Sequence, residues 1–287
     1  MKRIYLTECP RDAMQGIQTF IPTELKLKYI QQLLKVGFDV LDFGSFVSPK
    51  AIPQMQDTSE VVKKLDVSNT STKLLAIIAN LRGAQDACQY PQITYLGFPL
   101  SVSKEFQKRN TNATIEDAYK RIEEIQELCV KNNKELRVYL SMAFGNPYNE
   151  EWSPEKVFSM AEKLYQMGIR HIALADTIGC STPENIQHLF QHLIKQLPQI
   201  NWMAHLHSTP NTAMEKVAAV INNGCLSFDS AMMGFGGCPM AKDELTGNIA
   251  TEVVLNYAEK QGLQTNINRQ EFQKARSIAQ EIFSQYH

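Results

Sequence analysis

Short apolar runs alternate with helical stretches along nearly the whole chain of 287 residues. Eight of these runs have the composition of β-strands, and they are residues 3–9, 39–44, 73–79, 92–98, 136–143, 171–175, 202–207 and 226–231. Such an alternation predicts a parallel sheet, and eight strand–helix units favour a closed (β/α)₈ barrel of the TIM type. An open doubly wound sheet is the alternative, and it is disfavoured because no GxGxxG follows the first strand.

The helical stretches begin and end at residues typical of helix termini. Thr114, Ser153 and Thr182 are predicted N-caps, and proline follows the last two at the first helical position. Gly168 and Gly224 are predicted to end helices directly before strands.

The length of the chain is typical of one barrel, so we expect a single domain over residues 1–287. Residues 269–286 have a helical pattern and predict an extra helix on the barrel, within a C-terminal helical extension over 268–287.

Charge and composition exclude several functional classes. The net charge is −1 without a long block of one sign, so neither nucleic acid nor a membrane surface is an expected partner. The first residues lack the apolar core of a signal peptide, and the six cysteines form no CxxC pair. We therefore expect a cytoplasmic protein whose cysteines are mostly reduced and buried.

In a (β/α)₈ barrel the active site lies at the carboxyl ends of the strands. His205 and His207 stand two residues apart on one predicted strand, so both imidazoles face the same side. Asp12 follows the first strand, which lies next to the closing end of the barrel. Two imidazoles and one carboxylate are a typical ligand set for a metal ion with open positions, whereas an isolated HxH is more often structural.

Arg11 lies beside Asp12 at the same strand end, where a guanidinium needs an anionic partner. Its donors suit an enolate or carboxylate oxygen of a substrate, and the alternative is a salt bridge to Asp42 or Glu8. Cys238 follows two glycines, so its thiol is either exposed for proton transfer and nucleophilic attack or packed as an ordinary free cysteine.

Several longer motifs carry a family resemblance. They are PRDAMQ (10–15), SFVSPKAIPQM (45–55), ANLRG (79–83), FQKRNTN (106–112), ADTIG (175–179), HLH (205–207), GFGGCPMAK (234–242) and TGN (246–248). With these motifs, in this order and over essentially the whole chain, the protein resembles the lyase branch of the DRE-TIM metallolyases, the 3-hydroxy-3-methylglutaryl-CoA lyases. SFVSPK and GGCP favour the lyases over the related isopropylmalate and homocitrate synthases.

The resemblance implies an activity and a set of site residues. The implied reaction is cleavage of 3-hydroxy-3-methylglutaryl-CoA, an acyl-CoA substrate, to acetyl-CoA and acetoacetate with Mg²⁺ or Mn²⁺. The implied roles are metal binding by Asp12, His205, His207 and Asn248, enolate stabilisation by Arg11, and substrate carboxylate binding by Ser45 and Thr177. Asp176 is implied either to support the metal site or to handle a proton. In the expected reaction the hydroxyl proton passes to Asp42 or to a metal-site histidine, and the enolate takes its proton from Cys238 or Asp176. Cys238 is implied to lie on a loop that closes over the substrate.

The chain departs from the family pattern at four places. Asp42 replaces the usual glutamate, MQGI (14–17) replaces LQNE, and Ser208-Thr209-Pro210-Asn211 replaces DTYG. The loop CPMAKDELTGN is one residue longer than the usual form. An aldolase or a condensing synthase of the same barrel, acting on a different 3-hydroxy acyl-CoA or 2-oxo acid, is therefore the alternative.

Several properties stay open from the sequence. The basic residues Lys50, Lys104, Lys108 and Arg109 either contact CoA phosphates or lie on a solvated surface. The sequence leaves open whether the chain forms a homo-oligomer, and whether the pathway is leucine degradation or ketone-body formation.

Overall fold

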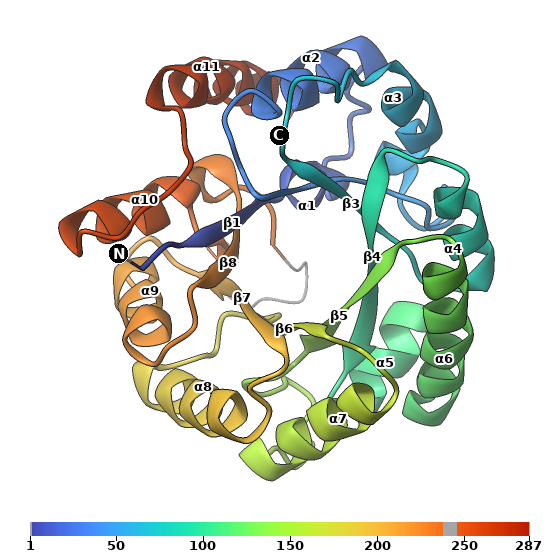
Figure 1. Ribbon diagram of the computed structural model, residues 1–287, viewed down its shortest axis with the longest axis vertical. Coiled ribbons are helices and arrows are strands. Elements are labelled where there is room, and N and C mark those ends of the chain that lie inside the picture. Colours follow the sequence, from blue (N-terminus) through green and yellow to red (C-terminus); the bar gives the residue numbers. More distant parts are fainter. Residues whose placement is uncertain (1, 238–245, 287) are drawn as a thin grey trace.

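The computed structural model describes residues 2–237 and 246–286. Eight parallel strands close into a barrel, with helices around its outside (Figure 1). The strands are β1 (Tyr5–Glu8), β2 (Val40–Ser45), β3 (Lys73–Ile77), β4 (Ile93–Ser101), β5 (Glu135–Ser141), β6 (His171–Asp176), β7 (Asn201–Ser208) and β8 (Ser227–Ser230). Each strand pairs with the next along the chain, and β1 pairs with β8. The predicted TIM barrel is confirmed, and the open sheet is excluded.

One helix of the outer ring follows each strand. The ring consists of α2 (Thr23–Leu33), α3 (Thr58–Lys64), α4 (Leu81–Cys88), α6 (Ile115–Lys131), α7 (Pro154–Gln166), α8 (Pro183–Gln196), α9 (Ala213–Asn222) and α10 (Thr251–Lys260). The predicted extra helix is α11 (Arg269–Tyr286), which packs against α2 (Figure 1).

Five short elements lie outside this regular pattern and were not predicted. Helix α1 (Pro10–Gln15) follows β1 directly, and α5 (Lys104–Thr111) follows β4. The 3₁₀ turn η2 (Met232–Gly234) follows β8, and the two-residue strand β9 (Gly247–Asn248) pairs antiparallel with β7. A further 3₁₀ turn, η1 (Pro53–Met55), precedes α3. These elements are too short to produce a helical or strand periodicity in the sequence.

The predicted helix termini are confirmed at the residues named. The hydroxyls of Thr114, Ser153 and Thr182 each accept a hydrogen bond from a backbone N–H in the first turn of the helix that follows. Gly168 and Gly224 have φ angles of 86° and 92°, a left-handed conformation that favours glycine.

Most of the apolar core lies between the barrel and the surrounding helices. The barrel interior holds a much smaller apolar cluster, formed by Tyr139, Ala173 and Met203. The rest of the interior near the carboxyl strand ends is polar, which is the region where the site residues were predicted. Among the described residues, no helix combines the length and the apolar composition that a membrane crossing requires.

Glu8, the last residue of β1, is fully buried and links β1 to η2 and to the start of α10. Its carboxyl oxygens accept hydrogen bonds from the Met232 backbone N–H (2.6 Å) and from the Thr251 hydroxyl (2.6 Å). Burial is the main effect on this carboxyl, and it outweighs both hydrogen bonds and raises the pKa of Glu8 to about 8.

We expect Glu8 to make the stability of the fold depend on pH. The pKa of the folded state lies above the unfolded value, so the stabilising effect of the bound proton is complete below about pH 4.5 and is lost by about pH 8. Glu8→Gln imitates the protonated carboxyl, so the free energy of unfolding of the wild type should fall relative to the variant over this range. The expected fall is on the order of a few kcal/mol. Urea unfolding of both proteins between pH 5 and pH 9 measures it, and a constant difference would contradict the assignment.

Candidate active site

The carboxyl ends of the strands surround a cavity of about 380 Å³. Arg11 and Asp12 reach it from α1, Thr177 from the end of β6, and His205 and His207 from β7. The closure of the barrel therefore brings residues from the beginning of the chain beside residues almost 200 positions later.

Asp12, His205 and His207 offer ligand atoms that all lie within 4.8 Å of one another. His207 donates its Nδ1–H to the backbone carbonyl of Thr177 (3.0 Å), because a carbonyl can only accept. Its Nε2 atom is buried and has no hydrogen-bond partner among the described residues. A buried ring nitrogen left with a free lone pair, beside a second imidazole and a carboxylate, fits a divalent cation.

Asn248 extends this group from β9. Its side-chain nitrogen donates to Asp12 Oδ2 (2.7 Å) and to the Phe235 carbonyl (3.0 Å), so its carbonyl oxygen is the atom available to a cation. Gly236 makes this approach feasible. A Cβ atom at position 236 would lie 2.8 Å from Asn248 Nδ2 and 2.8 Å from the Asp12 backbone oxygen, and its φ of 88° also favours glycine.

Burial and the charges of the site shift the pKa values of the three titratable predicted ligands. Burial would raise the pKa of Asp12, but Arg11, both histidines and Asn248 outweigh burial and lower it to about 2. Burial lowers the pKa of His207, and the neighbouring His205 lowers it further. Burial also acts to lower the pKa of His205, but the hydrogen bond and charge of Asp229 reverse the effect and raise it. Asp12 is therefore an anionic ligand at neutral pH.

Arg11 is held in place on several sides and still lines the cavity. Its Nε lies 3.1 and 3.2 Å from the two Asp42 oxygens, and a terminal nitrogen lies 2.5 Å from one of them. The other terminal nitrogen donates to Asp12 (2.9 Å) and to Gln15 (2.9 Å). The salt bridge and the cavity position, which were alternatives from the sequence, thus occur together. The partner is Asp42, since Glu8 bonds to Met232 and Thr251 instead.

Asp42 is buried beneath Arg11 and is not part of the cavity lining. Burial raises the pKa of Asp42 to about 6, although the charge and hydrogen bonds of Arg11 act against this shift. Since both carboxylate oxygens accept from Arg11, the geometry suits a residue that positions the guanidinium.

Asp176 is also buried away from the cavity lining. Its oxygens accept from the backbone N–H groups of Cys180 (2.8 Å) and Ser181 (2.9 Å), and Lys216 lies 3.0 Å away. Lys216 also donates to the carbonyls of Gly179 (2.9 Å) and His207 (2.8 Å). This buried group fixes the loop after β6, including Thr177, against the end of β7.

The two remaining predictions concern Ser45 and Cys238. Ser45 lies in a neighbouring cavity, where its backbone N–H donates to the Thr58 hydroxyl and its own hydroxyl accepts from the Val47 N–H. Cys238 lies outside the described residues.

The sequence reasoning missed three residues that shape the site. Gln15 donates to Asp12 (2.7 Å) and accepts from Arg11, and its position four residues after Arg11 is the usual signal for one helix face. Asp229 contacts His205. The one sequence feature that could have revealed Asp229 is its charge within an otherwise apolar predicted strand. Lys216 lies on α9 in an ordinary amphipathic pattern, which gave no signal.

The opposite wall of the cavity is apolar, with Val47, Ile52, Ile77, Pro99 and Phe106 among its lining residues. A further cavity, the arginine-lined cavity, has a volume of about 520 Å³. It shares Ala79, Arg109, Asn110 and Thr111 with the main cavity. Its lining contains three arginines, Arg82, Arg109 and Arg121, and one acidic residue, Glu124. Of the four basic residues named from the sequence, Arg109 is the one that lines these cavities.

Comparisons with known proteins agree with this geometry. The family model described as HMGL-like matches residues 4–279. The cytoplasmic 3-hydroxy-3-methylglutaryl-CoA lyase of Rattus norvegicus is 33% identical over 261 residues, which are 90% of this chain and 75% of that protein. The mitochondrial hydroxymethylglutaryl-CoA lyase of Homo sapiens is 33% identical over 277 residues, 96% of this chain and 84% of that protein.

Solved structures give the same result. An HMG-CoA lyase from Acinetobacter baumannii, in complex with coenzyme A and 3-methylmalate, has a TM-score of 0.90 at 30% identity. The comparison covers 98% of this chain and 92% of that one. The hydroxymethylglutaryl-CoA lyase from Pseudomonas aeruginosa has a TM-score of 0.91 at 30% identity and covers 98% and 93%.

We expect His207→Ala to weaken binding of Mn²⁺ to the metal-free protein on the order of 10²-fold, because the variant removes one of few protein ligand atoms. Isothermal titration calorimetry measures the affinity. His192→Ala is the matched control, since His192 is exposed on α8, and it should bind Mn²⁺ like the wild type. Equal affinities for the His207→Ala and wild-type proteins would refute the assignment of His207 as a ligand.

Proposed function

The chain belongs to the HMGL-like family, and from this membership we propose that it is a carbon–carbon lyase that cleaves 3-hydroxy-3-methylglutaryl-CoA to acetyl-CoA and acetoacetate. One observation carries the proposal: Arg11 and the ligand group of Asp12, His205 and His207 line the same cavity. The C2–C3 bond breaks when the substrate hydroxyl is activated while the thioester accepts the electron pair. This cavity has a candidate group for each, the metal ligands for the hydroxyl and Arg11 for the thioester.

Asp12, His205, His207 and Asn248 are the residues that would hold the divalent cation, which we propose to be Mg²⁺ or Mn²⁺. A bound cation supplies Lewis acidity that makes the tertiary hydroxyl of the substrate easier to deprotonate. Asp12 contributes the negative charge of the ligand set, and the apolar wall excludes water from the reacting carbons.

Arg11 meets the charge that develops during the reaction. When the C2–C3 bond breaks, its electron pair moves into the thioester and makes an enolate oxygen. The guanidinium is fixed beforehand by Asp42, Asp12 and Gln15, so little reorganisation is needed when the charge appears. We therefore propose that Asp42 positions Arg11. Protonation of the enolate carbon completes acetyl-CoA, and Cys238 remains our proposal for the donor.

We propose roles for three further site residues from their positions. Thr177 lines the cavity and is proposed to hold the free carboxylate of the substrate. Asp176, tied to Lys216 and to the loop backbone, is proposed to keep Thr177 and His207 in place rather than to transfer a proton. Ser45 lies next to this cavity and remains a candidate for substrate binding through the loop that follows it. We also propose a cytoplasmic location.

The direct test is cleavage of 3-hydroxy-3-methylglutaryl-CoA by the purified chain, with acetoacetate and acetyl-CoA measured separately. Both products should form in equal amounts when Mg²⁺ or Mn²⁺ is present, and EDTA should abolish their formation. If the metal-loaded protein leaves this substrate intact but acts on another 3-hydroxy acyl-CoA, or condenses acetyl-CoA with a 2-oxo acid, the alternative reading replaces this proposal.

We expect Arg11→Met to lower kcat by about 10²–10⁴-fold, because the lost interaction is made mainly with charge in the transition state. Arg11→Lys keeps a positive charge but loses the planar guanidinium, so its kcat should lie between those of Arg11→Met and the wild type. Arg170→Met, at an exposed arginine, serves as the control and should not change kcat. A near-normal kcat in Arg11→Met would show that the guanidinium does not stabilise the enolate.

The arginine-lined cavity supports the proposal of an acyl-CoA substrate, because three arginines suit the phosphates of a nucleotide. We expect the double variant Arg82→Gln/Arg121→Gln to raise the KM for the CoA thioester about tenfold, which is about 1.4 kcal/mol. The corresponding pantetheine thioester lacks the nucleotide, so its KM should change less than about twofold. An equal effect on both thioesters would refute the phosphate contact.

A further inference from the structure

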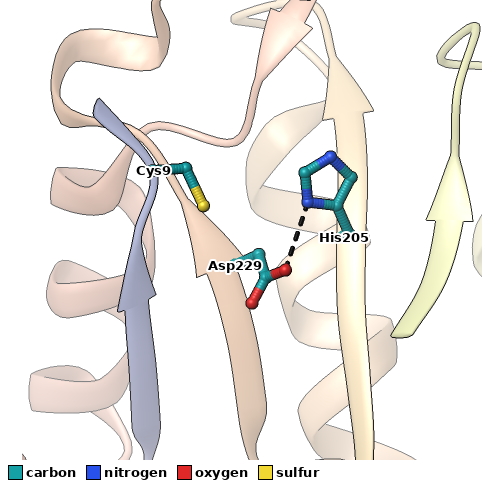
Figure 2. Close-up of side chains that lie close together, drawn as sticks. All are labelled: Cys9, His205 and Asp229. Carbon is teal, nitrogen blue, oxygen red and sulfur yellow. Dashed lines mark hydrogen bonds and ion pairs between the residues drawn. The ribbon is translucent and has the colours of Figure 1, made fainter. Parts of the chain in front are cut away.

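Asp229 lies on β8 directly beside His205 on β7, and the two residues are partners in the strand register. The carboxylate is fully buried inside the barrel, and one of its oxygens lies 3.3 Å from His205 Nδ1. Figure 2 shows this hydrogen bond, with the second ring nitrogen of His205 on the side away from Asp229, toward the carboxyl end of β7. Asp229 is thus below the ligand group and outside the lining of the main cavity.

Asp229 is held from the opposite side of the barrel. Arg137, on β5, places a terminal nitrogen 3.4 Å from the other Asp229 oxygen and donates to the Thr7 hydroxyl (3.0 Å). The Arg137 and Asp229 side chains are 4% and 0% exposed, so this ion pair is buried in the barrel interior. A carboxylate that is paired with a guanidinium accepts hydrogen bonds, so His205 is the donor in its contact with Asp229.

The two histidines of the site therefore have different supports. His207 donates Nδ1–H to a backbone carbonyl, whereas His205 donates Nδ1–H to the side-chain carboxylate of Asp229. In both cases the Nε2 lone pair is directed to the site, but the support of His205 also makes the ring a stronger donor to a cation.

We propose that Asp229 is a positioning residue that fixes the tautomer and orientation of His205 and strengthens its binding to the divalent cation. This inference rests on the metal site of the proposed function and assigns a residue that was found neither by motif nor by its position at a strand end. Arg137 holds Asp229 in place from across the barrel.

Cys9 is the third member of this cluster, because its sulfur, a His205 nitrogen and an Asp229 oxygen lie within 4.8 Å of one another (Figure 2). The same three atoms would be a second ligand set for a metal. Against this, the His205 nitrogen that faces Asp229 is already hydrogen-bonded, and the Arg137 charge lies close to the carboxylate. The cluster therefore fits an orienting role better than a separate cation site.

Two variants test the proposal through Mn²⁺ affinity of the metal-free protein. Asp229→Asn keeps the size of the side chain and removes its charge, and Asp229→Asn/Arg137→Gln also removes the buried guanidinium that would be left unpaired. Both should bind Mn²⁺ about 10–100-fold more weakly by isothermal titration calorimetry. Asp57→Asn is the matched control, since Asp57 is a buried aspartate paired with Lys26 at 2.9 Å outside the site, and its Mn²⁺ affinity should stay at the wild-type value.

The outcomes separate an orienting role from a purely structural one. Folded variants that are less stable but bind Mn²⁺ like the wild type would overturn the proposal about Asp229. That result would leave the proposed lyase function untouched, because the cleavage assay tests it separately. Weak binding by the single variant with normal binding by the double variant would attribute the effect to the unpaired Arg137, and would overturn it as well. A wild type that binds no Mn²⁺ would remove both the inference and the metal site on which it rests.

A second measurement needs no variant of Asp229. In the Mg²⁺-loaded wild type with ¹⁵N-labelled histidine, His205 should carry its proton on Nδ1. A proton on Nε2 would contradict the proposal, whatever the stability of the variants.

Discussion

The pairing of β1 with β8 is the constraint on which the rest of the site depends. Tyr5, Leu6, Thr7 and Glu8 are register partners of Ser227, Phe228, Asp229 and Ser230. This pairing closes the barrel, with β8 between β1 and β7 (Figure 1). It sets Asp12, just after β1, beside His205 and His207 on β7. A shift of one residue would turn the inward side chains of β7 or β8 outward, so the register decides which residues face the cavity.

Each functional side chain at the barrel mouth is supported by a buried partner below or beside it. Asp42 supports Arg11, Asp229 supports His205, and the carbonyl of Thr177 supports His207. Two buried cations extend the supports further: Arg137 holds Asp229, and Lys216 holds Asp176 together with the His207 carbonyl. Such buried pairs are weak sources of stability, since desolvation offsets much of their attraction. Their effect is on geometry, because they leave each catalytic group a single well-defined position.

The sequence predicted those features that depend on local periodicity and on strand ends. The eight strands, the capping residues Thr114, Ser153 and Thr182, and the terminal helix all arise from short-range patterns, and their boundaries agree within a few residues. The convergence of Asp12, His205 and His207 followed from the rule that barrel sites lie at carboxyl strand ends. The supports could not be settled in the same way, although the Arg11–Asp42 salt bridge and a supporting role for Asp176 were among the alternatives from the sequence. Whether Asp42 and Asp176 face the cavity or a buried cation depends on long-range contacts with Arg11 and Lys216, and so does the role of Asp229.

Three of the four departures from the family pattern lie among the described residues, and most of the lengthened loop, residues 238–245, lies outside them. Ile17, at the position of the usual acidic residue, packs into the apolar core, and Gly16 ends α1 without close neighbours. Ser208 pairs with Gly247 in the strand register, and Asp42 lies beneath Arg11. None of these described residues lines the main cavity. These substitutions therefore change the surroundings of the site rather than the side chains that line the main cavity. A lyase can accommodate such changes when the supporting contact is preserved, as it is between Asp42 and Arg11, because the reacting groups depend on where they are held rather than on which residue holds them.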